Sequence, residues 1–498
     1  MKSPTSSISS RPRRLRDFLQ QKYESIPKTK RHAMLAITCL LWFVVVGAVS
    51  GIASLEHGAD RPAAGEANTD NTSSSPTTSS AAPTTSTGPI SYRMALSIMS
   101  RQQGIMNTTT EPGAALQAGI VQKAFAALNA YHGSSQPEIQ AYIDKSTAAA
   151  ASLMTNEAAD LTHWPLDRLS NGNAMLADTT NSPTVAAALD ALRNTVHLNN
   201  MNDESGLWYW QNYPYWSYLD GMYSLGPFVA QDYTHGTAGD DAVITITSTP
   251  SHDATQALAD KAMLQFDLLW MHCRNSTTGL LVHGYDANRA APWASKVTGA
   301  SGVVWARGLG WFMMAVVDTM ELVWPTWHGG GEGAAVPAPQ VPYFRRLRGM
   351  YVSLVMAVLR YADEEETASG EGGGVGWFQV VDGAGREGNY VESSATAMFA
   401  YALLKGARLG YLGPDDVPLA REAGVAAHKL LLGRFVTVNE DGLFDWAGSV
   451  GVCSLNSTAT YDYYVSQPLV PNSVLGAAAF VLASVEVERL NDVSVGLQ

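Results

Sequence analysis

Residues 208–230 read WYWQNYPYWSYLDGMYSLGPFVA, and eight of them are Trp or Tyr around a single acid, Asp220. Aromatic faces pack against the C–H faces of sugars, and partial burial raises the pKa of a carboxyl toward that of a general acid. The stretch therefore predicts a site of the kind that a glycosidase needs. The alternative is that Asp220 caps the helix that the pattern predicts from here onward, through Phe228.

From Ile90 onward, apolar residues recur at three- and four-residue spacing, which predicts an all-α fold. Strand signals are few, at 242–249 and 377–381. Many helices with long Gly-rich loops favour a ring of helical hairpins, but the periodicity does not separate a ring from a solenoid or a bundle. The predicted helices span residues 90–102, 114–131, 136–153, 184–198, 220–231, 251–273, 304–324, 343–361, 393–411, 417–433 and 473–489.

Charge is distributed unevenly along the 498 residues. The formal net charge is −13, yet residues 1–31 carry +7 by themselves, which leaves −20 for the remainder. An acidic body of this kind argues against a nucleic-acid partner. It also repels polyanions at long range, so an acidic ligand needs local cations to hold it.

The N-terminal part of the chain predicts a membrane anchor. Residues 33–55 are uncharged and long enough to span a bilayer, and the basic tail 1–32 precedes them. The positive-inside rule gives a single-pass type II protein with a cytoplasmic tail, and its body lies outside the cell or in the secretory lumen. Cleavage near 48–53, as in a signal peptide, is the alternative and would release a secreted protein. The Ser/Thr/Pro-rich linker 56–89 leads to the predicted hydrolase domain, 90–498.

Glycosylation sequons agree with that compartment, and two cysteines of the body fit either of two states. Cys39 lies in the predicted span, whereas Cys273 and Cys453 either pair or remain buried thiols. The sequons begin at Asn71, Asn107, Asn275 and Asn456.

Two polar residues outside the aromatic stretch are candidates for chemistry. Asp167 lies in WPLDRLSNGN (164–173), where the alternatives are an N-cap or a surface ion pair with Arg168. His283 lies in LVHGYD, and a lone histidine is more often structural than functional.

The motif WARGLGW (305–311) indicates a functional site more strongly than Asp167 or His283 does alone. Trp305 and Trp311 flank Arg307, and two glycines between the tryptophans allow close approach of other groups. Arg binds carboxylates bidentately, although a structural Arg–Trp stack is the alternative.

Motifs for other chemistries are absent from the sequence. There is no P-loop, dinucleotide fingerprint, HExxH, zinc-type cysteine spacing or GxSxG elbow. Hydrolysis without a metal or a nucleophilic serine leaves carboxylate chemistry. Glu392, in GNYVESSATAMF, fits a helix cap and receives no catalytic assignment.

Four blocks in order carry a resemblance to a known family. They are WPLDRLSNGN, YLDGMYSLGPFVA, LLVHGYDANRAAPWASKVTGASGVVWARGLGWFMMAVVD and GNYVESSATAMFAYALLKGARLGY, and the closing YDYYVSQPLVPNSVLGAAAFVLAS fits as well. From about Ile90 to Leu490 the chain resembles glycoside hydrolase family 105, the unsaturated rhamnogalacturonyl hydrolases, which are related to the unsaturated glucuronyl hydrolases of family 88.

This resemblance implies an (α/α)6 barrel without cofactor or metal, acting on a small oligosaccharide with an unsaturated uronyl end. The family chemistry is hydration of a vinyl ether: Asp220 would be the general acid/base and Asp167 the second carboxylate. Tyr209 and Trp210 stand where many members have His-Lys, and Tyr218 where Trp is common, which leaves the departing sugar open. The implied substrate-binding residues are His283, Trp305, Arg307, Trp311, Tyr218 and Trp210.

Three other functions remain open from the sequence. They are an unsaturated glucuronyl hydrolase, an inverting glycosidase with Asp167 and Asp220 as separate acid and base, and a non-catalytic sugar-binding module. The two acids, the histidine and the Trp–Arg–Trp motif together favour an enzyme.

Overall fold

All described residues lie in one of the two units of the chain, Thr84–Gln498. The predicted span 33–55 and the strand predicted at 242–249 lie outside them. Among the helices described, none combines the length and the apolar character that crossing a bilayer requires. The computed structural model describes residues 88–133, 136–237, 252–323, 341–366 and 373–495.

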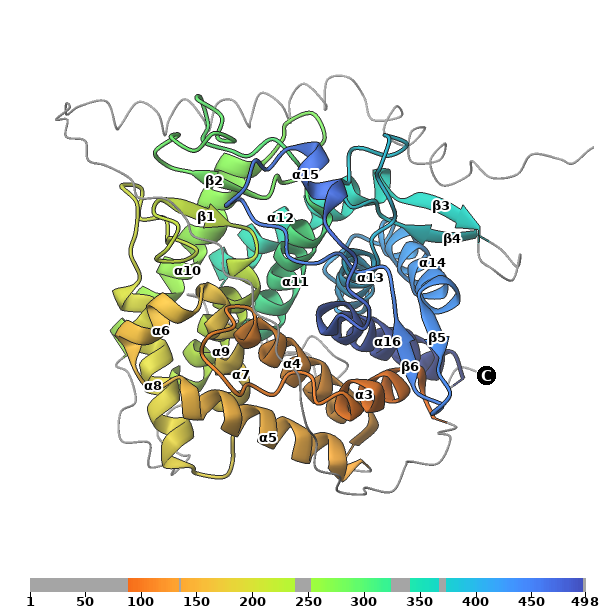
Figure 1. Cartoon of the computed structure of the whole chain (residues 1–498), viewed down its shortest axis with the longest axis horizontal. Coiled ribbons are helices and arrows are strands. Elements are labelled where there is room, and N and C mark those ends of the chain that lie inside the picture. Colours follow the sequence, from red (N-terminus) through yellow and green to blue (C-terminus); the bar gives the residue numbers. More distant parts are fainter. Residues whose placement is uncertain (1–87, 134–135, 238–251, 324–340, 367–372, 496–498) are drawn as a thin grey trace, which may run out of the picture. The chain divides into compact units, whose positions relative to one another are not determined.

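The described chain is mostly helical (Figure 1), and every helix predicted from the sequence is present. Two of them, α9 and α16, continue further than predicted, and four short elements were not predicted: α6, η2, α7 and α15. In chain order the helices are α3 (Ile90–Ser100), α4 (Ala114–His132), α5 (Pro137–Leu153), α6 (Glu157–His163), the 3₁₀ helix η2 (Leu166–Asn171), α7 (Gly172–Leu176), α8 (Pro183–Leu198), α9 (Gly221–Thr237), α10 (His252–Cys273), α11 (Ala306–Val323), α12 (Val341–Arg360), α13 (Ser393–Arg408), α14 (Val417–Arg434), α15 (Tyr461–Ser466) and α16 (Val474–Val495).

The packing order of the described helices is a closed double ring. The inner members are α4, η2, α9, α11, α13 and α16; each packs on the next, and α16 returns to α4. The outer members pack against them in the same order: α5 on α4, α8 on α7, which directly continues η2, α10 on α9, α12 on α11, α14 on α13 and α3 on α16. Inner and outer elements alternate along the chain, which is the arrangement of an (α/α)6 barrel and not of an open solenoid.

Burial separates the two rings. The inner helix α11 is buried all round from Ala306 to Met320, and α13 is buried from Ser393 to Ala407. The outer helix α8 instead buries one apolar stripe, which includes Val185, Leu189 and Leu192, because solvent covers its other face.

Three short two-stranded antiparallel sheets accompany the ring. They pair β1 (Trp216–Tyr218) with β2 (Gly284–Asp286), β3 (Asp363–Glu366) with β4 (Gly373–Gly376), and β5 (Val436–Val438) with β6 (Phe444–Trp446).

The strand predicted at 377–381 is wrong. Phe378 and Val380 make only isolated bridges, and strand β4 ends before this segment at Gly376. The backbone N–H of Val380 donates to the side chain of Asn389, so a side chain occupies the place of a neighbouring strand.

Two smaller predictions are decided by the structure. Cys273 and Cys453 are both buried free thiols, which confirms the alternative without a disulfide. Glu392 is the N-cap of α13, and its carboxylate accepts a hydrogen bond from the backbone N–H of Ala395 at 2.6 Å, as predicted.

Candidate active site

The antiparallel pairing of β1 with β2 brings Asp220 and His283 together from distant parts of the chain. Tyr218 pairs with Gly284, and the N–H of Leu219 donates to the carbonyl of His283 at 3.0 Å. The next residue, Asp220, then places its Oδ2 3.2 Å from Nε2 of His283. The two atoms are in contact without hydrogen-bond alignment, and neither has another partner among the described residues, so both keep hydrogen-bonding capacity for a third group.

Asp220 is not the cap of helix α9. The helix begins at Gly221, but within the described residues the Asp220 carboxylate accepts no hydrogen bond from its backbone N–H groups. The side chain faces His283 instead, and the residue is 8% exposed. The capping alternative is therefore wrong, and this carboxyl is left available for chemistry.

His283 is enclosed by aromatic rings. Its Nδ1 lies 2.7 Å from Oη of Tyr464, and its ring centroid lies 4.6 Å from that of Trp305 and 5.1 Å from that of Tyr218. When Tyr464 donates its O–H to Nδ1, the proton of the neutral imidazole lies on Nε2 and faces Asp220. The tautomer that Asp220 meets is therefore coupled to the direction of the hydrogen bond between His283 and Tyr464.

Asp167 lies in the 3₁₀ helix η2, and the hydroxyl of Tyr209 donates to its Oδ2 at 2.7 Å. The ring of Tyr209 stacks on Tyr218 with centroids 4.4 Å apart. Oδ1 of Asp167 is buried without a partner among the described residues. Both carboxyls of the predicted site thus retain a free oxygen.

The two alternatives for Asp167 are wrong. The N-cap position of η2 is Pro165, and Arg168 is buried and donates to Pro165 and to Oγ1 of Thr195, both at 3.0 Å. Arg168 therefore belongs to the interior of the helical ring and does not form a surface ion pair with Asp167.

Burial raises the pKa of Asp167 to about 7, and the nearby charge of Asp220 adds to this increase. The hydrogen bond from Tyr209 partly offsets it because it favours the ionised form. Asp167 is consequently protonated up to near-neutral pH, in a site where a second ionised carboxylate would repel the first.

The raised pKa of Asp167 predicts how the free energy of unfolding depends on pH. In the folded state the pKa of Asp167 lies above its ordinary value, so the folded protein binds more protons and the free energy of unfolding falls between about pH 4 and pH 7. The variant Asp167→Asn has no ionisable side chain at this position, so it lacks this fall in the free energy of unfolding. We expect the variant to equal the wild type near pH 4 and to exceed it by up to about 4 kcal/mol at pH 8.

Urea unfolding of both proteins across this pH range measures the difference. Asp203→Asn, at an exposed acid away from the site, is the control and should change stability little at any pH. A difference between Asp167→Asn and the wild type that does not vary with pH would contradict the expected protonation of Asp167.

Arg307 supports Trp305 and a neighbouring loop. The residue is 2% exposed, lies over the Trp305 ring at 5.0 Å, and donates to the carbonyls of Val450 and Gly451. Both terminal nitrogens thus contact the chain itself. These contacts match the structural Arg–Trp stack, and the predicted substrate contact of Arg307 stays a prediction.

The glycines of the same motif give the close approach that was predicted. A Cβ on Gly308 would lie 3.3 Å from His283 and 3.4 Å from Oδ2 of Asp220, and a Cβ on Gly310 would lie 3.0 Å from Met398. A Cβ on Gly308 would also lie 3.1 Å from Trp305, so a side chain at this position would press on the Trp305 and His283 rings at the start of α11.

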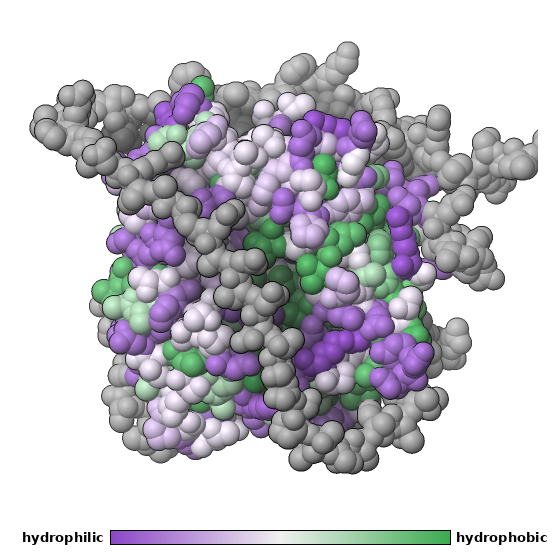
Figure 2. Space-filling model, in the orientation of Figure 1, coloured by the Kyte–Doolittle hydropathy of each residue, from purple (hydrophilic) through white to green (hydrophobic). Residues whose placement is uncertain are grey.

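The remaining predicted sugar-binding residues lie at different depths. Trp210 is at the rim, where its Nε1 donates to the carbonyl of Thr162 at 3.0 Å. Trp311 is buried and contacts Tyr223 with centroids 4.5 Å apart. Figure 2 shows hydrophobic side chains gathered around a hollow near the centre of the face in view. The sugar contacts of these residues stay predictions.

Sequence reasoning did not assign Tyr209 and Tyr464 to the site, yet each one contacts a predicted catalytic or binding residue. Tyr209 follows Trp208 in the aromatic stretch, so its position was visible, but its bond to Asp167 joins residues 42 positions apart. Tyr464 lies 181 residues from His283 in sequence. No pattern within either segment indicates such a pairing.

Tyr464→Phe is expected to lower kcat by up to about tenfold and to shift its pH profile, with little change in KM. The reason is that the imidazole of His283 loses the hydrogen bond that sets its tautomer. Steady-state kinetics across pH measure the effect. Tyr463→Phe is the matched control, since the Tyr463 hydroxyl bonds to the N–H of Ser454 and not to His283; equal effects of the two changes would refute the role of Tyr464.

Among the described residues, no group of three or more His, Cys, Asp or Glu side chains is arranged to hold a metal ion. The chemistry that the described residues offer consists of two carboxyls, one imidazole and a surrounding aromatic wall.

Comparisons with known proteins agree with this arrangement. The Glycosyl Hydrolase Family 88 profile matches residues 90–491. Protein Atu3128 of Agrobacterium fabrum is 34% identical over 214 residues, which are 42% of this chain and 82% of that protein. A C. acetobutylicum ATCC 824 glycoside hydrolase from family 105 has a TM-score of 0.63 and 26% identity, over 81% of this chain and 100% of that one.

A more distant structure shares the fold alone. The unsaturated glucuronyl hydrolase from Bacillus sp. GL1 has a TM-score of 0.51 and 11% identity, over 80% of this chain and 95% of that one. The chain belongs to glycosyl hydrolase family 88, in the group that also includes family 105, and it is a glycosidase.

Proposed function

We propose that the chain is an unsaturated uronyl hydrolase, and that it releases the 4,5-unsaturated galacturonyl residue from disaccharides of rhamnogalacturonan. The observation that carries the proposal is the Asp220–His283 contact, in which Oδ2 and Nε2 lie 3.2 Å apart and both lack a hydrogen-bond partner among the described residues. A water or a sugar oxygen placed between them would be bound by a carboxylate and an imidazole together.

The proposed reaction is hydration of the vinyl ether. Asp220, protonated, delivers its proton to C4, and the cation that develops at C5 is attacked by the oxygen of one water. The Asp220 carboxylate then takes a proton from that water and returns to its acid form. The resulting hemiketal opens and the second sugar is expelled, so the net reaction consumes one water and regenerates Asp220.

Asp167 supports this chemistry as the second carboxyl. Its buried position and the charge of Asp220 raise its pKa to about 7. The two carboxyls repel one another when both are ionised, so the pair retains a proton near neutral pH, and the reaction starts when that proton resides on Asp220. The hydrogen bond from Tyr209 to Oδ2 leaves Oδ1 as the oxygen available to water or substrate.

The galacturonyl–rhamnose preference rests on the resemblance to family 105, and the similarity to a C. acetobutylicum family 105 hydrolase over the whole length of that protein supports it. The second candidate is an unsaturated glucuronyl hydrolase. The relative from Bacillus sp. GL1, described as responsible for the degradation of glycosaminoglycan, shares the barrel. Tyr209, which stands where many members resembling this chain have His, donates to Asp167, so this chain uses a tyrosine at that position beside the second carboxyl.

Hydrolysis of purified unsaturated disaccharides tests the proposal, because loss of the conjugated double bond lowers ultraviolet absorbance. We expect a higher kcat/KM on unsaturated galacturonyl-rhamnose than on glycosaminoglycan-derived disaccharides. The reverse order would select the glucuronyl hydrolase.

Two further outcomes would replace the proposal itself. Turnover of a saturated glycoside at a similar rate would indicate an inverting glycosidase with Asp167 and Asp220 as separate acid and base. Binding of every unsaturated disaccharide without turnover would indicate a sugar-binding module.

A further inference from the structure

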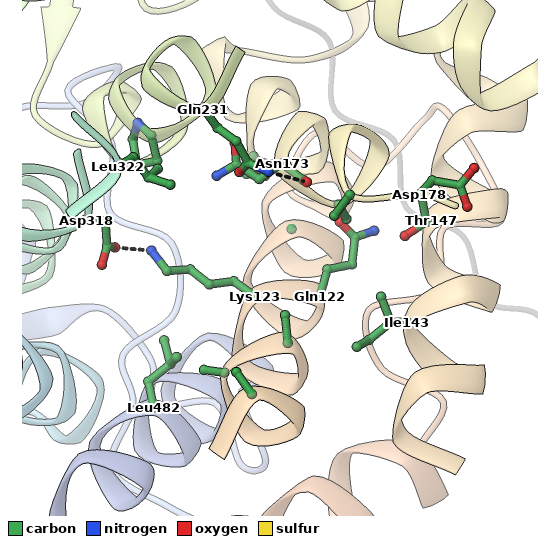
Figure 3. Close-up of a pocket in the computed structure, with 18 of the residues that line it drawn as sticks. Gln122, Lys123, Ile143, Thr147, Asn173, Asp178, Gln231, Asp318, Leu322 and Leu482 are labelled. Atoms are coloured by element: carbon green, nitrogen blue, oxygen red, sulfur yellow. Dashed lines mark hydrogen bonds and ion pairs between the residues drawn. The ribbon is translucent and has the colours of Figure 1, made fainter. Parts of the chain in front are cut away.

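A cavity lies between α5 and the inner elements of the helical ring (Figure 3). Its volume is about 410 Å³, which lies within the range of small-molecule sites. One of its lining residues, Asp318, follows Gly308 of the catalytic site by ten positions on α11, or about 15 Å at the rise of an α-helix. The cavity is therefore distinct from the Asp220–His283 site.

One side of the cavity is formed by charges that satisfy one another. Asp318 contacts Lys123 and lies 2.6 Å from Nζ of Lys405, which also lies 2.6 Å from Glu321. The hydroxyl of Tyr401 donates to Asp318 at 2.7 Å. Both lysines of the lining are thus already paired with carboxylates, and this side offers no uncompensated cation to an anionic ligand.

The opposite side presents a buried acceptor whose orientation is fixed. Ser146 uses its O–H on the carbonyl of Gly104, and Asn171 uses its amide N–H on the carbonyl of Ala115. The oxygens of both residues therefore require a donor, and Nε2 of Gln122 supplies it at 3.0 and 3.1 Å. The amide of Gln122 cannot be flipped without losing both bonds, so its Oε1 is left over.

This Oε1 atom has no hydrogen-bond partner among the described residues, although Gln122 is only 2% exposed. Thr147, which is 4% exposed and lines the same cavity, has an Oγ1 in the same condition. A buried polar atom without a partner costs free energy, which a ligand that donates hydrogen bonds recovers.

The charge of the cavity lining indicates which kind of hydrogen-bond donor a ligand would bring. Two further carboxylates line the cavity, Asp144 and Asp178, and Figure 3 shows Asp178 on the same side as Gln122 and Thr147, with Lys123 and Asp318 on the other. Four acids against two lysines give the described lining a net charge of −2. Ala126, Ala174 and Ile143 add apolar walls suited to a hydrocarbon chain.

We propose that this cavity is a binding site for a small organic cation that carries ammonium groups on a short aliphatic chain. One ammonium group donates to Oε1 of Gln122 and Oγ1 of Thr147 beside the Asp178 carboxylate, and the chain packs against the alanines of α4 and α7.

Calorimetric titration of the full-length protein with 1,4-diaminobutane tests the site, with 1,4-butanediol as the uncharged probe of similar shape. We expect the diamine to bind and the diol to bind at least about tenfold more weakly, since hydrogen bonds to charged groups are the stronger ones. Equal binding of the two probes would overturn the assignment of a cation, and absence of diamine binding at millimolar concentration would overturn the site.

Two variants locate the bound amine. Thr147→Val keeps the shape and removes a hydroxyl that has no partner among the described residues, and Asp178→Asn removes one charge at a half-buried position; each should weaken diamine binding by about tenfold. Asp203→Asn changes the net charge equally at an exposed residue outside the cavity lining and should leave affinity unchanged. Wild-type affinity in both cavity variants would overturn the proposal.

Discussion

Asp220→Asn is expected to lower kcat/KM on unsaturated uronyl disaccharides by about 10²- to 10⁴-fold, the usual contribution of a general acid/base. The amide keeps the size of the side chain beside His283 but can neither deliver a proton nor take one from water. Because Asp220 is one cause of the raised pKa of Asp167, the same change should also lower that pKa. The rate is followed as loss of ultraviolet absorbance of the conjugated double bond.

The control for this prediction is Asp203→Asn, which removes an exposed carboxylate elsewhere and should keep wild-type kcat/KM. Binding of the disaccharide to Asp220→Asn should persist, since the aromatic wall is unchanged. Near-wild-type turnover by Asp220→Asn would assign proton transfer to another group, of which Asp167 is the nearest described carboxyl in the site.

Asp318→Asn is expected to lower the free energy of unfolding by about 3–5 kcal/mol, the cost of removing one partner from a buried ion-pair network. Burial by itself raises the pKa of Asp318, but Lys123 and Lys405 outweigh burial and hold that pKa below its usual value. Without the carboxylate, Lys123 loses its ion-pair partner inside the ring. The loss is measured from urea unfolding at pH 7.

Glu321→Gln is the matched control within the same network. The Glu321 side chain is 41% exposed and pairs with Lys405, so its removal should cost at most about 1 kcal/mol. Similar losses from the two changes would show that burial of Asp318 does not set its contribution. Activity of the folded Asp318→Asn protein should remain, because the network lies about 15 Å along α11 from the catalytic site.

Periodicity located the long helices because each of them buries an apolar stripe or is buried all round. It missed η2 and α7, which follow one another from Leu166 to Leu176 and replace one inner helix of the ring. This segment contains Asp167, Arg168, Ser170 and Asn171, all buried and, apart from one oxygen of Asp167, held by hydrogen bonds. Because its buried residues are polar, this segment lacks the apolar periodicity from which a helix could be predicted.

The site was predictable as a set of residue types but not as a set of contacts. Asp220 and His283 meet because two three-residue strands pair in one register, and strands that short give no sequence signal. The partners of Arg307 are backbone carbonyls of Val450 and Gly451, more than 140 residues away. The Trp–Arg–Trp motif indicated Arg307 as a candidate site residue, whereas its hydrogen-bond partners are visible only in the structure.

The bond that joins the two ends of the ring has a consequence for synthesis of the protein. Ser91 on the first described helix binds both oxygens of Glu488 on the last, at 3.0 and 2.6 Å across 397 positions. A linear repeat array can add units as the ribosome releases them, but this ring cannot close until α16 has emerged. Until then the inner faces of α4 and α13 lack α16 as a neighbour, so the nascent chain leaves apolar surface uncovered that the complete ring buries.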